Sequence, residues 1–228
     1  MVGFVMADGA TGRVLEAIDE TLPQPPASVT KAVTALYAIE GLGGDYHFKT
    51  EIYGTAPVVD GVLDGDLVLA GGGDPNLLTD DLLALAGRLK ESGLREVKGD
   101  FLVWGGALPA LEEIDESQLD HLGYNPAISG LNLNFNRVHF EWKRANGDYT
   151  VTMDARSETI RPTVTIARMD IVDRNLPIYT YRDGSDIDRW TVARRALGNS
   201  GSRWLPVRNP ELYAGDVFRT FARSEASP

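Results

Sequence analysis

The stretch PASVTKAVTALYA, residues 26–38, decides how the chain begins to fold. Three prolines lie before or at its start, and a proline lacks the amide donor that a helix interior needs. After them, apolar side chains recur at the spacing of one helix face, at Val29, Ala32, Val33, Leu36 and Tyr37. A group of glycines ends the pattern, at Gly41, Gly43 and Gly44. The sequence therefore predicts a helix over residues 28–42.

Two reactive side chains lie at the start of this helix. Ser28 and Lys31 are three positions apart, so on a helix they are neighbours and can touch. A serine becomes a nucleophile when a base takes its proton, and a lysine can be that base when desolvation disfavours its ammonium. Lys31 is the only charged residue between Ser28 and Ile39, which is typical of a helix buried on most sides. We therefore interpret Ser28 as a candidate nucleophile and Lys31 as its partner.

The same pair has a second interpretation, in which Ser28 only caps the helix and Lys31 lies on the surface of its first turn. A motif of four residues is weakly specific, so the interpretation depends on the surrounding sequence.

Before the helix, residues 2–7 and 13–18 are apolar-rich and joined by a glycine-containing turn, which predicts a β-hairpin.

The middle of the chain predicts two β-rich blocks. Residues 48–104 alternate short strand-like runs with turns, and they contain one crossover helix from a Thr79 cap to about Glu91 and a strand over 97–104. Further strand-like runs follow at 138–142, 149–154, 163–167 and 178–181. The acidic stretch 112–120 is interpreted as a solvated helix or loop, and the acidic stretch 183–188 as a solvated turn. A last amphipathic helix is predicted over 211–223.

Composition narrows the classes of function. The formal net charge of −11 disfavours nucleic-acid binding, and the absence of cysteine excludes disulfides and thiolate metal sites. His47, His121 and His139 match no metal-ligand spacing, so neither a metal nor a cofactor is predicted. No run of about 18 apolar residues predicts a membrane span, and no signal-peptide pattern is present.

Taken together, these motifs resemble the penicillin-binding-protein-4 type of D-alanyl-D-alanine carboxypeptidase and endopeptidase, a serine peptidase of the penicillin-recognising superfamily. Residues 26–38 look like its nucleophile helix, and Gly65–Leu77 looks like its Gly-Asp-Leu strand and Gly-Gly-Asp-Pro turn. Residues 48–51 look like the strand that enters its inserted domain, and Gly99-Asp100 looks like its next strand. Residues 124–129 and 206–214 also fit, more loosely.

The resemblance implies an α+β fold in which a partial transpeptidase/β-lactamase-like domain, residues 1–44 plus 206–228, is interrupted by one or two inserted β-rich domains over 45–205. It also implies a periplasmic, cofactor-free hydrolase of peptidoglycan stem peptides. In such an enzyme Ser28 forms an acyl-enzyme with Lys31 as base, and β-lactams acylate Ser28.

The chain departs from the family pattern in one respect. It contains neither the Ser-x-Asn nor the Lys-Thr-Gly motif that is typical of penicillin-binding proteins, and Lys49-Thr50-Glu51 does not replace the latter. We therefore expect an N-terminal part that is nearly inactive alone. Two alternatives stay open at this point: a non-catalytic module that binds or senses wall peptides, and a β-lactamase relative.

Overall fold

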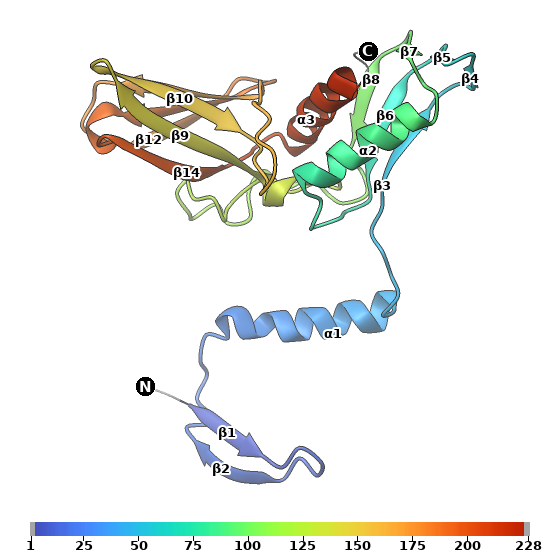
Figure 1. The fold of residues 1–228 in the computed structure, drawn as a ribbon. Helices are drawn as coiled ribbons and strands as arrows, with labels where there is room; N and C mark the ends of the chain where they lie inside the picture. The colour runs from blue at the N-terminus through green and yellow to red at the C-terminus, as the bar shows by residue number, and fades with distance from the viewer. Residues whose placement is uncertain (1–2, 226–228) are drawn as a thin grey trace. The chain divides into compact units, whose positions relative to one another are not determined.

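The computed structural model describes residues 3–225 and divides into two compact units, Met1–His47 and Phe48–Pro228. In the first unit, strands β1 (Phe4–Ala7) and β2 (Val14–Ile18) pair antiparallel, which confirms the predicted hairpin (Figure 1). The Asp8 carboxylate closes the turn by accepting hydrogen bonds from the backbone and the hydroxyl of Thr11, at 2.8 and 2.6 Å.

The predicted helix over 28–42 is confirmed with a modified start. A 3-10 turn, η1 (Ala27–Val29), leads into helix α1 (Thr30–Leu42), which ends at Gly43 with φ of +88°. The expectation that this helix is buried on most sides is wrong for the described chain, because Val33 and Tyr37 are 68% and 79% exposed. The apolar face follows from the local sequence, but burial needs a second apolar surface, which the hairpin alone does not supply.

The second unit begins with two small sheets and one crossover helix (Figure 1). Strands β3 (Thr50–Gly54), β6 (Leu67–Gly71) and β8 (Phe101–Trp104) form the first sheet in the order β3-β6-β8. The second joins β4 (Val58–Val59), β5 (Val62–Leu63) and β7 (Glu96–Val97). Helix α2 (Thr79–Glu91) links the parallel strands β6 and β8, which confirms the crossover. The single strand predicted over 97–104 is two strands, β7 and β8.

The predicted Thr79 cap is wrong, because Leu78 occupies the position before the helix. The Asp81 carboxylate accepts a hydrogen bond from the Leu78 amide at 2.9 Å. Thr79 is the first helical residue, is buried, and donates its hydroxyl to the carbonyl of Ala155 at 2.7 Å. Asp81 therefore supplies one half of a capping box, in which the side chain three residues into the helix accepts from the amide of the residue before it.

Two more three-stranded sheets complete the β-structure. Strands β9 (Arg137–Ala145), β10 (Asp148–Asp154) and β14 (Ser200–Pro206) are ordered β10-β9-β14. Strands β11 (Ala167–Val172), β12 (Tyr179–Asp183) and β13 (Asp188–Ala193) are ordered β11-β13-β12. Strands β13 and β14 were not predicted from the sequence, and the strand expected over 163–167 begins only at Ala167, with an isolated bridge at Thr163. Short 3-10 turns lie at η2 (Asn134–Asn136) and η3 (Arg194–Ala196).

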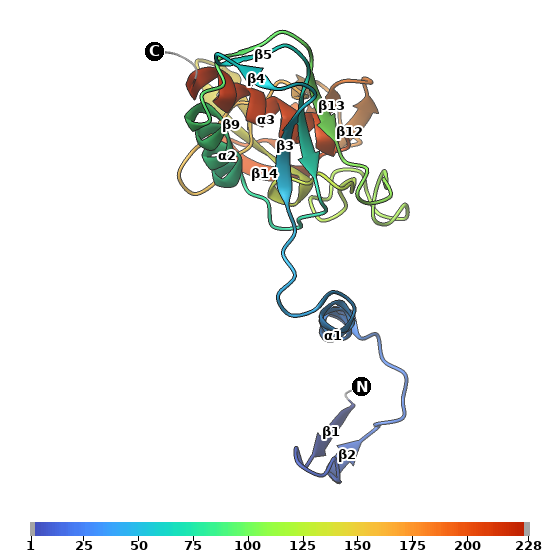
Figure 2. The ribbon, with the colours of Figure 1, turned by 90° about the vertical axis from the view of Figure 1, so that its right-hand side faces the viewer.

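The last helix, α3 (Pro210–Glu225), confirms the amphipathic helix predicted over 211–223. It packs beside α2, as Figure 2 shows, and against β8, with the rings of Phe101 and Phe218 stacked at 5.7 Å. Gly215 permits this approach, since a Cβ there would lie 2.6 Å from Val103 Cγ1. Burying the Phe218 side chain stabilises this contact by about 1.5–3 kcal/mol. The assignment of 206–228 to a core shared with 1–44 stays a prediction.

Candidate functional site

The structure brings the two predicted site residues together. Lys31 Nζ donates a hydrogen bond to Ser28 Oγ at 2.9 Å. Ser28 lies in the 3-10 turn η1 and Lys31 in the first turn of α1, so the helical rise places one side chain over the other. A neutral lysine amine at this distance could take the hydroxyl proton directly, which is the contact that nucleophile activation requires.

Both side chains are exposed in the described chain, so the burial that the sequence analysis expected around Lys31 is absent. Within residues 3–225, the hydrogen bond to Lys31 is the one that the structure gives to the Ser28 hydroxyl. The pair therefore has the geometry for proton transfer, while the desolvated environment that would favour a neutral lysine is not formed around it.

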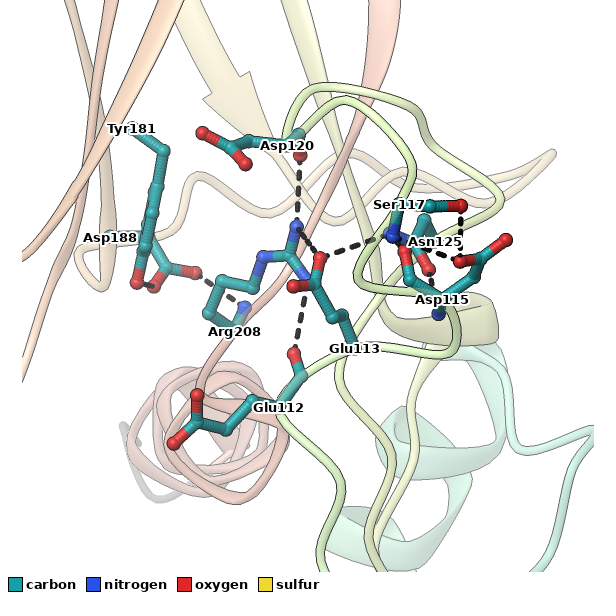
Figure 3. Close-up of polar contacts among 9 residues, drawn as sticks. All are labelled: Glu112, Glu113, Asp115, Ser117, Asp120, Asn125, Tyr181, Asp188 and Arg208. Carbon is teal, nitrogen blue, oxygen red and sulfur yellow. Dashed lines mark hydrogen bonds and ion pairs between the residues drawn. The ribbon is translucent and has the colours of Figure 1, made fainter.

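A second polar cluster, which the sequence analysis missed, centres on Arg208 in the unit of residues 48–228 (Figure 3). The Arg208 guanidinium donates to the carbonyl of Glu112 at 3.0 Å and to that of Asp120 at 3.1 Å. It also forms an ion pair with Glu113 at 3.3 Å, and its side chain is only 10% exposed. The acidic stretch 112–120 is thus a loop, as one alternative predicted, but one anchored at three points by a nearly buried cation.

The expectation of a solvated turn over 183–188 is wrong at Asp188, which is not solvated. Its side chain is fully buried at the start of β13. Its carboxylate accepts hydrogen bonds from the Tyr181 hydroxyl at 3.1 Å, the Arg208 amide at 2.9 Å and the Asn209 side chain at 2.9 Å. Burial raises the pKa of the Asp188 carboxyl, and these hydrogen bonds oppose that rise. Two of the three donors, Arg208 and Asn209, lie 20 and 21 residues away along the chain, so no local pattern could have identified this site.

Two cavities flank the η2 turn. A cavity of about 440 Å³ lies on one side and has a mostly apolar lining that includes Leu108, Ile114, Tyr124 and Ile128. A cavity of about 580 Å³ on the other side is lined by Leu78, Asp80, Arg156, Thr159 and Trp204, among others. Phe135 and Arg137 line both cavities. The sequence signal for this region, Asn132-Leu133-Asn134-Phe135-Asn136, was not interpreted as a site.

The histidines pack against aromatic rings. His121 stacks on Tyr179 at 5.0 Å, and His139 meets Trp204 edge-on at 4.8 Å. In the part of the chain that the structure describes, no cluster of histidine and carboxylate side chains is placed to hold a metal ion.

None of the helices described between residues 3 and 225 is both long and apolar enough to cross a bilayer.

Comparisons with known proteins agree on one family. Over 99 residues the chain is 43% identical to a D-alanyl-D-alanine carboxypeptidase of Actinomadura sp., covering 43% of this chain and 18% of that protein. Over 102 residues it is 28% identical to D-alanyl-D-alanine carboxypeptidase DacB of Haemophilus influenzae, covering 45% of this chain and 21% of the relative.

The fold is similar to the crystal structure of penicillin-binding protein 4 from Haemophilus influenzae, with a TM-score of 0.70 and 20% identity. That match covers 98% of this chain and 51% of the solved chain, so this chain spans about half the length of that relative. A structure of the same protein in complex with a β-lactam gives a TM-score of 0.69. The model of the D-Ala-D-Ala carboxypeptidase 3 (S13) family matches residues 1–224, and the chain belongs to this family.

Proposed function

We propose that this chain carries the nucleophile of a serine D-alanyl-D-alanine carboxypeptidase/endopeptidase that acts on peptidoglycan stem peptides. The observation that supports the proposal most directly is the 2.9 Å hydrogen bond between Lys31 and Ser28 at the start of α1. Membership of the S13 family and the names of both relatives support the reaction class.

In the proposed reaction Ser28 Oγ attacks the carbonyl carbon of the D-Ala-D-Ala bond while Lys31 Nζ accepts the hydroxyl proton. The C–N bond then breaks, a proton goes to the leaving amine of D-alanine, and the peptide remains as an ester on Ser28. Water then attacks the ester carbonyl and gives a proton to Lys31, which passes it to Ser28 Oγ. The shortened peptide leaves as a carboxylic acid, and the serine is restored. The endopeptidase reaction follows the same steps with a crosslinking amine as the leaving group.

The pair at Ser28 needs further groups for this chemistry. A tetrahedral oxyanion needs preorganised donors, and a lysine base needs an environment that disfavours its charge. We propose that residues 1–44 and 206–228 belong to a transpeptidase-like domain, with inserted β-rich segments over 45–205, and that the exposed apolar face of α1 is covered in the complete active site. Covering this face would desolvate the first turn of α1, where Lys31 lies.

The proposed reaction also implies where the protein acts and which compounds inhibit it. Peptidoglycan is assembled outside the cytoplasmic membrane, so we propose a periplasmic location. A β-lactam would acylate Ser28 through its carbonyl carbon, and the resulting adduct would hydrolyse slowly. The β-lactam complex of the Haemophilus influenzae relative concerns that protein and supports the idea by analogy of fold.

Intact-mass spectrometry of the full-length protein, with and without benzylpenicillin, tests the proposal. We expect an adduct that maps to the peptide containing Ser28, its loss in Ser28→Ala, and its retention in the control Ser202→Ala, which changes an exposed serine of β14. An adduct on another residue, or an unchanged adduct in Ser28→Ala, would refute the assignment of the nucleophile.

The main alternative is a module that binds wall peptides without cleaving them. It predicts that benzylpenicillin leaves no covalent adduct and that D-Ala-D-Ala peptides bind equally well to wild type and Ser28→Ala. A third outcome, fast turnover of benzylpenicillin without a long-lived adduct, would indicate a β-lactamase relative.

A further inference from the structure

Three consecutive residues in the η2 turn adopt a left-handed backbone conformation. The φ angles of Asn134, Phe135 and Asn136 are +51°, +58° and +50°. Asparagine tolerates this region, whereas a phenylalanine there is a genuine outlier. Strain of this kind persists only where the surroundings hold it in place, and it is concentrated at binding sites.

The surroundings of this turn hold it from several segments. Asn134 is buried, accepts a hydrogen bond from the Thr79 amide at 3.1 Å and donates one to the Thr79 hydroxyl at 2.8 Å. Asn136 is also buried, accepts from the Leu133 amide at 3.0 Å and donates to the Ala127 carbonyl at 2.8 Å. The start of α2 and the segment around Ala127 therefore both fix the strained conformation.

This turn presents an aromatic ring and a cation. The Phe135 side chain is 52% exposed, and the Arg137 guanidinium carbon lies 5.1 Å from the centre of its ring. The same carbon lies 5.4 Å from the centre of the Trp204 ring. Arg137 thus contacts two aromatic rings and lines both cavities.

The charge of Arg137 has no carboxylate partner among residues 3–225. Its Nε is buried and lacks a hydrogen-bond acceptor, and the ion pairs of the described residues do not include it. The other arginine at the 580 Å³ cavity, Arg156, pairs with Asp154 at 2.8 Å and with Glu141 at 3.0 Å. Among the described residues no acceptor offsets the charge of this half-buried guanidinium, so an acceptor that a ligand supplies to its outer nitrogens would be favourable.

We propose that the 580 Å³ cavity beside Phe135, Arg137 and Trp204 binds a small carboxylate that carries an aromatic or acyl group. The carboxylate would lie on the outer nitrogens of the Arg137 guanidinium, whose planar fork matches two carboxylate oxygens. The apolar part would pack on the Phe135 and Trp204 rings. This site lies apart from Ser28 in the sequence and does not depend on the reaction proposed for it.

The cavity's own acidic residues favour a carboxylate over a phosphate group. Asp80 and Glu158 line it, and hydrogen bonds from Thr159 and Ser157 lower the pKa of the Asp80 carboxyl, so Asp80 is ionised near neutral pH. A doubly charged phosphate would be repelled more strongly than a singly charged carboxylate.

An NMR titration of the ¹⁵N-labelled full chain with N-benzoylglycine tests the site. N-benzoylglycinamide is the matched neutral probe, because it keeps the ring and the amide and lacks the carboxylate. We expect saturable shifts at the Trp204 indole N–H and the amides of 134–137, with affinity for the acid at least about tenfold above that for the amide. Equal affinities for acid and amide, or no saturable shift at these positions, would overturn the proposal without any variant.

A variant then identifies the cation. Arg137→Gln should weaken binding of N-benzoylglycine at least about tenfold, while Arg168→Gln, an exposed arginine of β11, should leave it unchanged. The amide spectrum of Arg137→Gln shows whether the variant is folded. A folded Arg137→Gln that binds as tightly as wild type would contradict the assignment of Arg137, and the comparison of the two probes stands if the variant does not fold.

Discussion

The Asp188 carboxylate accepts a 2.9 Å hydrogen bond from the backbone amide of Arg208, and this contact joins the start of β13 to the segment that enters α3. Asp188 is buried, and Arg208 in turn anchors the loop over 112–120 through its guanidinium. The backbone of Arg208 therefore joins β13 to the entry of α3, and its side chain holds the loop. Asp188 and Arg208 can be tested by separate substitutions.

Replacing Asp188 by Asn should destabilise the unit of residues 48–228 by about 1–3 kcal/mol, because the amide keeps one acceptor oxygen and turns its NH₂ toward a donor. Urea unfolding at neutral pH measures the change. Asp186→Asn, an exposed neighbour, is the matched control and should change stability by less than about 0.5 kcal/mol. Equal stability of the two variants would show that the Asp188 hydrogen bonds contribute little.

Replacing Arg208 by Gln should release the loop over 112–120, because one guanidinium makes all three anchoring contacts. We expect faster hydrogen exchange of the loop amides and a loss of about 1–3 kcal/mol of stability. Arg195→Gln removes one exposed hydrogen bond to Asn175 and serves as the control. Unchanged exchange over 112–120 in the Arg208 variant would contradict the anchoring role.

Two glycines predict stability changes of opposite sign. A Cβ at Gly71 would collide with the backbone of Gly130 and Leu131, so Gly71→Ala should destabilise by about 1–3 kcal/mol or more. A Cβ at Gly87, inside α2, meets nothing within 4 Å, so Gly87→Ala should stabilise by about 0.5–1 kcal/mol. Thermal unfolding of both variants checks the sign, and a stabilised Gly71→Ala would mean that β6 and the segment at 130–131 separate readily.

His139 predicts a pH dependence of stability. Burial, and secondarily the charge of Arg156, lowers the pKa of the imidazole below its ordinary 6.5. The unfolded chain then binds the proton more readily than the folded one, so stability is fully present above about pH 6.5 and falls as the pH decreases through the folded-state pKa. Urea unfolding at pH 7.5 and 5.5 should show a smaller loss in His139→Phe, which keeps a ring against Trp204.

His121 is the matched comparison, because burial, and secondarily the charge of Arg203, also lowers its pKa. His121→Phe should likewise reduce the loss on acidification, whereas His47→Phe changes an exposed histidine of the other unit and should leave the unfolding of residues 48–228 unchanged. A loss of stability that is the same in wild type and His139→Phe would contradict a neutral buried imidazole.

If Ser28 is the nucleophile, replacing Lys31 should slow the acylation of Ser28. Lys31→Met removes the amine that donates to Ser28 Oγ, so benzylpenicillin acylation of the full-length protein should slow by about 10²–10⁴-fold. The rate of adduct formation, followed by intact mass, measures this. Lys49→Met changes an exposed lysine outside α1 and is the control. An acylation rate within about twofold of wild type in Lys31→Met would exclude the base role, since general bases contribute far more.

The sequence by itself determined the elements whose signals are local. The hairpin, the helix over 28–42, the crossover helix and the last helix were predicted from apolar spacing, prolines and glycines, and each is present in β1–β2, α1, α2 and α3. The contact between Ser28 and Lys31 follows in the same way, because three positions on a helix bring two side chains together. Such features depend on residues within one or two turns of each other.

Only the tertiary structure decided which polar residues are buried and where the chain is strained. Asp188 resembles its acidic neighbours in sequence, and its burial depends on Arg208, 20 positions away. The left-handed turn at Asn134 depends on Thr79, 55 positions away. The exposure of α1 likewise could not be predicted from its apolar pattern. Burial and strain are set by partners that the fold brings together, and a local pattern carries no record of those partners.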